Sequence, residues 1–370
     1  MNIFTARDPL AAIDTTMSTA QAIGITTRTK ERKTVRWCLA VPIAALCVTA
    51  SAQITLNTSV WMPHNHPLVA DMTVPFCADI EKVTEKRVRC NILPKAVVGP
   101  AQTFDAVKNG VADLSFIVDG YTPGRFVASK VAEFPFNGAT GEINSVAYQR
   151  IYERMLAKAD EHKGVKVLAV FTHGPAQIHN SKRSINTLKD IEGLKIRTGG
   201  GVINDTINAI GGTAMMKPTP EVYELLSSGI IDGFVLPKET STSMKLTPFV
   251  KHVTEVPGGI SNAAFSFIMN PAKWGKISGP DQAAMQKLFG EALARRCGLA
   301  WDAADAKSEQ EMKAAGVKFD KVSPQLVEEI RKKTEPLEVA WYRDVKAKGI
   351  DGEAALKALR AEVDALSHKP

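Results

Sequence analysis

The sequence lacks the short motifs that mark common nucleotide-binding and hydrolytic sites. It contains neither G-x-G-x-x-G nor G-x-x-x-x-G-K-[ST], and it has no G-x-S-x-G nucleophile elbow. Aromatic residues make up only 6% of the chain, and no run of Lys and Arg is interleaved with them. A nucleic-acid-binding surface is therefore not expected, and no nucleotide or other cofactor is predicted.

Cysteine is scarce. The chain has five Cys, of which Cys38 and Cys47 fall within the first 52 residues. Cys77, Cys90 and Cys297 remain, an odd number with no short spacing, which argues against a zinc knot or a disulfide scaffold. One disulfide can form in an oxidising compartment, but the spacing leaves open which pair it joins.

The sequence also has little that would bind a metal ion. His64 and His66 form one pair of histidines and His173 and His179 another, and neither has a Cys or acidic cluster beside it. We interpret all four as solvated loop histidines and predict no metal site. His179 shares a strand face with Gln177, which makes it a candidate to line a cleft.

Long hydrophobic runs are missing, apart from a short one near the N-terminus. Residues 37–48 are uncharged and mostly apolar, too few to span a bilayer. A basic stretch at 28–36 precedes them, and Ala50-Ser51-Ala52 follows. This order predicts a secretory signal peptide cleaved before Gln53, and hence a periplasmic protein. We assign 1–52 to the leader, with the translation start open to Met17 or a later residue.

The remaining chain is apolar enough for two domains and carries a mild charge. Hydrophobic residues make up 45% of the 370 positions. The net charge is +7, and residues 1–52, with six Lys or Arg and three Asp or Glu, account for +3 of it. The other residues therefore carry +4, which does not indicate a polyanionic partner.

Strand-like and helix-like segments alternate along the chain. We expect strands near 54–58, 88–93, 113–118, 165–180, 194–197, 230–235 and 265–270. Helices are expected near 67–84, 99–109, 142–162, 202–210 and 219–229, and 271–366 should be mostly helical. The alternation predicts an α/β fold with parallel strands, two lobes with a cleft between them, and a helical C-terminal part.

The stretch 188–201 carries the strongest functional signal. Its predicted strand ends at Arg197, Gly199 to Gly201 follow, and a helix is expected to start at Val202. A guanidinium fits a carboxylate with two parallel hydrogen bonds. Glycines let backbone N–H groups come close to a ligand, and a helix N-terminus carries partial positive charge. The stretch therefore predicts an anion receptor centred on Arg197.

Three aromatic residues stand where a cleft would need apolar surface. Trp61 and Tyr121 each follow a predicted strand, and Phe234 follows Asp232-Gly233. In parallel sheets ligands sit beyond the carboxyl ends of the strands. We therefore expect Trp61, Tyr121 and Phe234 to line the cleft and to set the size of the ligand.

Four segments together resemble the extracytoplasmic solute-binding subunit of tripartite ATP-independent periplasmic (TRAP) transporters. They are Asp-Ala-Val-Lys-Asn-Gly-Val-Ala-Asp at 105–113, Leu-Lys-Asp-Ile-Glu-Gly-Leu-Lys-Ile-Arg at 188–197, Pro-Glu-Val-Tyr-Glu-Leu-Leu-Ser-Ser-Gly-Ile-Ile-Asp-Gly at 220–233, and Met-Asn-Pro-Ala-Lys-Trp at 269–274. The resemblance covers about 54–360. It implies a type II-like periplasmic binding protein with two lobes, which passes a small organic acid to TRAP membrane subunits.

The resemblance also implies boundaries and a binding role. Lobe 1 would comprise 53–173, completed by about 263–302, and lobe 2 would comprise 174–262, completed by about 303–370. Arg197 stands where the family has the Arg that pairs with the ligand carboxylate. Gln177 stands where many members have a second basic residue, and it would add a neutral hydrogen bond.

One departure from the family bears on the ligand. Leu236, between Val235 and Pro237, stands where sialic-acid and dicarboxylate members often have a polar residue. The cleft is therefore expected to be less polar, which favours a monocarboxylate with an apolar or aromatic body. The alternative is a secreted enzyme acting on a carboxylate, but the sequence offers it no acid/base pair. We predict a monomeric binding protein rather than an enzyme.

Overall fold

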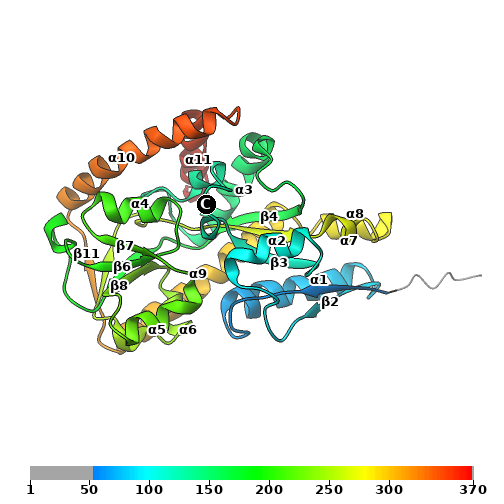
Figure 1. The fold of residues 1–370 in the computed structure, drawn as a ribbon, viewed down its shortest axis with the longest axis horizontal. Helices are drawn as coiled ribbons and strands as arrows, with labels where there is room; N and C mark the ends of the chain where they lie inside the picture. Colours follow the sequence, from blue (N-terminus) through cyan, green and yellow to red (C-terminus); the bar gives the residue numbers. More distant parts are fainter. Residues whose placement is uncertain (1–52, 369–370) are drawn as a thin grey trace, which may run out of the picture. The chain divides into compact units, whose positions relative to one another are not determined.

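The structure, a computed structural model, describes residues 53–368. The predicted signal peptide at 1–52 lies outside the described residues. Between residues 53 and 368, no helix is both long enough and apolar enough to cross a membrane. The described chain forms a two-lobed α/β fold with two separate sheets and helices packed around them (Figure 1).

Five strands form the first sheet, in the order β2 (Val88–Ile92), β1 (Ile54–Thr58), β3 (Leu114–Val118), β10 (Ala264–Met269) and β4 (Lys166–Thr172). β1 pairs in parallel with β2 and β3, whereas β10 runs antiparallel between β3 and β4. Every residue of β3 and of β10 is buried. Strands buried on both faces need layers of helix above and below them, which the alternating sequence supplies.

Six strands form the second sheet, in the order β11 (Lys318–Lys321), β9 (His252–Glu255), β5 (Gln177–Asn180), β8 (Gly233–Leu236), β6 (Lys195–Thr198) and β7 (Thr213–Met216). β6 is parallel to β7 and β8, while β5 is antiparallel to β8 and β9. The sequence did not predict β9 or β11. The strand expected across 165–180 is in fact two strands, β4 and β5, which belong to different sheets.

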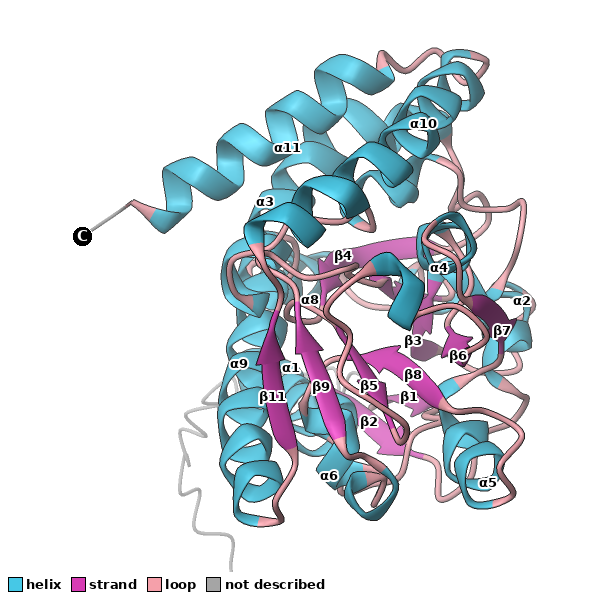
Figure 2. Cartoon of the chain, turned by 90° about the vertical axis from the view of Figure 1, so that its left-hand side faces the viewer, coloured by secondary structure: helices cyan, strands magenta, loops and turns pink. Residues whose placement is uncertain are grey.

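The helices surround these sheets. They are α1 (Val74–Val83), α2 (Thr103–Lys108), α3 (Gly141–Ile151), α4 (Val202–Ala209), α5 (Val222–Ser227), α6 (Glu239–Ser243), α7 (Pro271–Trp274), α8 (Gly279–Gln286), α9 (Glu291–Ala314), α10 (Pro324–Lys346) and α11 (Gly352–Ser367). We call the first sheet with α1 to α3, α7 and α8 the first lobe, and the second sheet with α4 to α6 the second lobe. Figure 2 shows α10 and α11 at one end of the second sheet and α5 and α6 at the other.

The chain passes between the lobes twice in extended form. It leaves the first sheet after β4 and enters the second at β5, and it returns between β9 and β10. Ala176 and Ser261 form an antiparallel bridge where the two crossing segments meet.

Helix α9 is the third connection. Its 24 residues span about 36 Å at 1.5 Å per residue. Asp302 accepts hydrogen bonds from the backbone N–H groups of Gly141 and Glu142 at the start of α3, the second at 2.9 Å. One turn later Asp305 accepts one from Glu239 at the start of α6, at 2.7 Å. One helix thus holds a helix of each lobe through two neighbouring carboxyl groups.

The C-terminal part contributes to both lobes. β11 extends the second sheet and α10 contacts α4, whereas α11 packs on α3. Trp341 of α10 and Leu356 of α11 belong to one apolar cluster with Tyr148 of α3. The segment 303–370, which was expected to complete lobe 2, is therefore divided between the lobes, because the apolar faces of α10 and α11 extend over α3.

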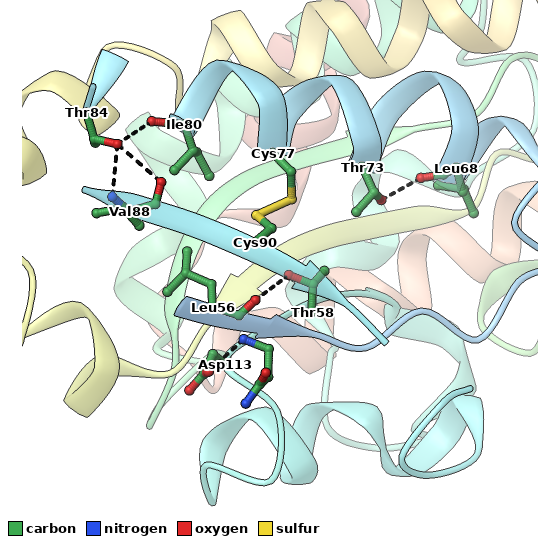
Figure 3. The surroundings of a disulfide bond; sticks show 11 residues. Leu56, Thr58, Leu68, Thr73, Cys77, Ile80, Thr84, Val88, Cys90 and Asp113 are labelled. Carbon is green, nitrogen blue, oxygen red and sulfur yellow. Dashed lines mark hydrogen bonds between the residues drawn. A yellow bond between two sulfur atoms is a disulfide. The ribbon is translucent and has the colours of Figure 1, made fainter. Parts of the chain in front are cut away.

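A disulfide joins Cys77 of α1 to Cys90 of β2, and Cys297 is a buried free thiol (Figure 3). Thr84 reinforces the same connection, since its hydroxyl donates to Ile80 O at 2.7 Å and accepts from Val88 N–H at 3.2 Å. The disulfide shows which two cysteines are joined, which their spacing in the sequence left open. It secures an edge strand to its covering helix.

Candidate functional site

The side chain of Arg197 is buried between the lobes. It lies on β6, and only 1% of it is exposed. Its Nε donates to Lys217 O at 2.7 Å, and its Nη2 donates to the hydroxyls of Thr219 at 3.2 Å and Tyr121 at 3.3 Å. No carboxylate of residues 53–368 forms an ion pair with it. Burial lowers the pKa of the guanidinium below its usual value, and the group still carries its charge, because arginine stays protonated in proteins.

The glycines after β6 allow the lobes to meet. Gly200 has a φ of +78°, and a Cβ there would overlap the carbonyl oxygen of Gly120, which follows β3 in the first lobe. Only glycine accepts both the backbone conformation and this contact. The glycine run therefore brings the end of β6 against the end of β3, with Arg197 beside the contact.

Tyr121 is the first-lobe partner of Arg197. Its hydroxyl lies 2.9 Å from Thr219 Oγ1 and accepts from Thr219 N–H at 3.0 Å. Together with the bond from Arg197, one phenol oxygen contacts three polar groups of the second lobe. These contacts hold the two lobes together at this edge of the cavity.

A cavity of about 620 Å³, its open mouth included, lies against Arg197. Both lobes and the crossing segments line it, with Trp61, Met62, His66, Leu68, Val118, Gly120, Tyr121, Glu133, His173, Ala176, Arg197, Gly199, Gly200, Ile203, Thr219, Val235, Leu236, Pro237, Glu239, Thr240, Ser261, Asn262, Ala263, Phe265 and Trp301. Arg197 is the one Lys or Arg in this lining. The cavity is thus a largely apolar chamber with a single fixed positive charge.

Two acidic residues of the lining have pKa values that are shifted in opposite directions. Burial raises the pKa of Glu133 to about 7, although its Oε2 accepts from Val202 N–H at the start of α4, at 2.9 Å. For Glu239, burial acts in the same direction, but His66 and the hydroxyls of Thr240 and Ser243 outweigh it and lower the pKa. His66 Nε2 lies 3.4 Å from Glu239 Oε1. Neither acid neutralises Arg197.

Three of the five predicted site residues line the cavity together: Trp61, Tyr121 and Arg197. The ring centroids of Trp61 and Tyr121 are 5.7 Å apart, and Trp61 Nε1 donates to Phe116 O at 3.1 Å. This bond holds the indole beside Tyr121, which contacts Arg197. An aromatic surface and a charged group therefore meet at one end of the cavity.

Gln177 and Phe234 lie elsewhere. The amide of Gln177 is occupied by the backbone of Val256, donating to its O at 3.1 Å and accepting from its N–H at 2.8 Å. Phe234 is fully buried and stacks on His179, with centroids 4.6 Å apart. Among the residues of β8, Val235 and Leu236 line the cavity instead. The structure thus places Gln177 and Phe234 in the second lobe's interior rather than on the cavity wall.

The interpretation of the four histidines as solvated is wrong for three of them. His66, His173 and His179 are buried, and only His64 is exposed. Partners at both ring nitrogens make this possible for His66 and for His173, which pairs with Gly174 O and Ala263 N–H, whereas Nε2 of His179 has no partner in the described chain. Across 53–368, no group of three or more His, Cys, Asp or Glu is placed to hold a metal ion.

Several lining residues were not singled out from the sequence. Glu133, Glu239 and Phe265 reach the cavity from segments far apart in the chain, and so do Asn262 on a crossing segment and Trp301 on α9. Among the lining residues, Pro237 was noted in the sequence only as the neighbour of Leu236. The others carry no local motif, because their positions depend on how the lobes pack.

The chain is similar to known proteins along most of its length. A family described as bacterial extracellular solute-binding protein, family 7, matches residues 58–344. A curated relative, the outer membrane transporter protein TsaT of Comamonas testosteroni, is 30% identical over 333 residues, which is 89% of this chain and 98% of that protein.

Two solved structures are similar along most of the chain. A TRAP periplasmic solute-binding protein of Bordetella bronchiseptica with bound (R)-mandelate and (S)-mandelate has a TM-score of 0.83 and 41% identity, covering 85% of this chain and 99% of that one. A TRAP solute-binding protein of Rhodoferax ferrireducens with copurified benzoate has a TM-score of 0.80 and 28% identity, with the same coverage.

Proposed function

Because the chain belongs to family 7 of the bacterial extracellular solute-binding proteins, the solute-binding subunits of TRAP transporters, we propose that it binds an aromatic monocarboxylate through Arg197. Proteins of this family work with membrane subunits and capture small acids outside the cytoplasm; they are not enzymes. The alternative of a secreted enzyme is therefore set aside. The proposal concerns the ligand class and the residue that binds it.

The single observation that carries the proposal is a buried guanidinium without an acidic partner, facing an apolar cavity. Arg197 already uses Nε and Nη2, and no hydrogen bond joins its Nη1 to a residue of the described chain. An uncompensated buried charge is costly, and a carboxylate is the partner that best matches it. A ligand carboxylate at Arg197 would supply the missing negative charge.

The charges of the cavity favour one carboxylate over two. Arg197 is the only Lys or Arg in the described lining, and Glu133 and Glu239 add acidic groups. A second ligand carboxylate would have no cation to meet and would be repelled by Glu239. The rings of Trp61, Phe265 and Trp301 offer surface to an aromatic body. The neighbours with mandelate and benzoate support the same class.

The proposal extends to export and delivery. Residues 1–52 have the order of a signal peptide, which supports export to the periplasm and a mature chain starting near Gln53. The mature chain would act as a monomer that hands its ligand to TRAP membrane subunits. N-terminal sequencing of periplasmic protein tests the first point, and a start before residue 36 would contradict it.

Isothermal titration of the purified protein tests the ligand class. Benzoate, phenylacetate and mandelate represent aromatic monocarboxylates, while succinate and glucuronate represent dicarboxylates and sugar acids. We expect binding of at least one aromatic monocarboxylate and at least tenfold weaker binding of the others. Preference for succinate or glucuronate would contradict the proposal.

A further inference from the structure

Two residues of the cavity wall each carry a buried polar atom without a hydrogen-bond partner in the described chain. The two atoms are Asn262 Oδ1, in the crossing segment between β9 and β10, and Trp301 Nε1, on α9. Asn262 is 1% exposed and Trp301 2% exposed, and both residues line the cavity. A buried polar group left unpaired costs free energy, so partners for these two are expected within reach. We call this part of the lining the hinge wall.

The neighbours of Trp301 do not supply its partner. The rings of His66, His173 and Phe265 surround the indole at centroid distances of 5.8 to 6.0 Å. Phe265 has no polar atom. His173 Nδ1 pairs with Gly174 O at 2.6 Å and Nε2 accepts from Ala263 N–H at 3.1 Å, so both nitrogens are used. His66 Nδ1 accepts from Leu68 N–H and its Nε2 faces Glu239, so the cavity that Trp301 lines is the remaining place for an acceptor.

A second, smaller cavity explains how Asn262 is oriented. It lies behind Asn262, between α3 and α11, and Asn144, Tyr148 and Thr172 also line it. Asn144 Nδ2, Tyr148 OH and Thr172 Oγ1 are buried and unpaired in the described chain, as Asn262 Oδ1 is. One water molecule can accept from Asn144 and Tyr148 and donate to Asn262 and Thr172, which satisfies all four.

The orientation of Asn144 supports this assignment. Its Oδ1 accepts from Ala139 N–H at 3.1 Å, which leaves Nδ2 as the end that points to the small cavity. The small cavity is therefore rich in donors, and Asn262 turns its acceptor oxygen toward it. The opposite end of the amide, Nδ2, donates to no residue of the described chain, and Asn262 also lines the ligand cavity.

We propose that Asn262 Nδ2 and Trp301 Nε1 form a second polar subsite on the hinge wall, which binds a hydroxyl oxygen of the ligand. Both groups are donors, so they match an acceptor oxygen and not a second donor. The hinge wall and Arg197 line the same cavity. This inference rests on the proposed function and narrows it to hydroxylated aromatic acids.

Two matched pairs of ligands test the subsite. Mandelate and phenylacetate differ by a hydroxyl beside the carboxylate, and 3-hydroxybenzoate and benzoate differ by a hydroxyl on the ring. In at least one pair the hydroxylated acid should bind wild type roughly 5- to 100-fold more tightly, the usual effect of pairing buried polar groups. The pair that shows the effect tells where the hydroxyl lies.

Variants of the hinge wall complete the test by isothermal titration. Trp301→Phe keeps a ring and removes the N–H, and Asn262→Ala removes the amide. Each should reduce the preference for the hydroxylated acid over the plain acid by roughly fivefold or more. Trp274→Phe, on α7 outside the cavity, is the control and should keep the full preference.

The outcomes separate this inference from the proposed function. If neither acid of either pair binds wild type, the proposed function itself fails. If the plain acids bind and no hydroxyl improves binding, the subsite is wrong. It is also wrong if the preference exists and both variants keep it. Should Asn262→Ala fail to fold, Trp301→Phe alone decides the matter.

Discussion

The first-lobe wall of the cavity presents aromatic and apolar side chains, whereas the second-lobe wall presents a buried charge. Trp61, Val118 and Phe265 come from segments of the first lobe, and no Lys or Arg of that lobe reaches the cavity in the described chain. Arg197 comes from the second lobe, between Thr219 and the glycines. Each wall alone is a poor site, because one lacks an anion partner and the other lacks apolar surface. A ligand that is apolar at one end and anionic at the other fits both.

The two walls also differ in how they affect the stability of the protein. Apolar side chains of the first-lobe wall are stabilised by packing whether or not a ligand is bound. Arg197 stays buried with its charge unbalanced, and only polar neighbours moderate it. We therefore expect changes in the second wall to alter affinity and changes in the first wall to alter affinity and stability together.

The largest expected effect is at Arg197. Removing one partner of a buried charged pair costs ~2–5 kcal/mol, so Arg197→Ala should weaken binding of the acid by roughly 30-fold to several thousand-fold. Arg197→Lys keeps the charge and loses the planar fork, and should fall between wild type and Ala. Titration calorimetry measures both. Arg154→Ala, which removes an exposed ion pair with Glu362, is the control and should bind as wild type.

Glu133, an acidic residue of the first-lobe wall, should make the stability of the protein depend on pH. The pKa of Glu133 is raised to about 7 in the folded protein, so this state holds the proton more tightly than the unfolded chain. The contribution of Glu133 to the stability of the protein is then largest at low pH. It falls as pH rises from about 4.5 through about 7, by up to roughly 3 kcal/mol.

Denaturant unfolding at a series of pH values checks this expectation. Glu133→Gln keeps an oxygen acceptor for Val202 N–H and removes the titrating proton, so its advantage over wild type should grow between pH 5 and pH 8. A constant difference across that range would mean that Glu133 does not titrate there.

At the aromatic wall, Trp61→Ala should weaken ligand binding by roughly 10- to 100-fold, since burying a large apolar side chain contributes about 1.5–3 kcal/mol. It should also lower stability to a smaller extent. Trp274→Ala is the matched control, because Trp274 packs against Phe289 away from the cavity. That variant should lose stability and keep affinity. Unchanged affinity in Trp61→Ala would assign Trp61 to the core alone.

The smallest expected effect is at the contact between the walls. Tyr121→Phe removes the hydroxyl that bonds Thr219 and Arg197 and keeps the ring. A neutral hydrogen bond contributes about 0.5–1.5 kcal/mol, so binding should weaken roughly 2- to 10-fold, mainly through faster dissociation. Stopped-flow kinetics measures the rate. Tyr152→Phe, whose hydroxyl faces His162 outside the ligand cavity, should leave dissociation unchanged.

Local pattern was enough to predict residues at the Arg197 end of the cavity. Arg197 at a strand end before three glycines, and Trp61 and Tyr121 after their strands, all line the cavity in the structure. Each of these positions follows from a strand and the turn after it. Gln177 was misplaced because its backbone position on β5 says nothing of Val256, whose main chain takes up the amide.

The hinge wall could not be predicted in this way. Asn262 and Trp301 are 39 positions apart and meet only because a crossing segment and α9 pass the same point. The strands β9 and β11 were missed as well. Packing between distant segments decides these features.

The central claim is that Arg197 pairs with the carboxylate of an aromatic acid, and a thermodynamic cycle tests it most directly. Isothermal titration compares one aromatic acid and its methyl ester on wild type and on Arg197→Ala. The account predicts that wild type prefers the acid by roughly 30-fold or more and that Arg197→Ala loses most of this preference. An equal preference for the acid in both proteins would contradict the claim.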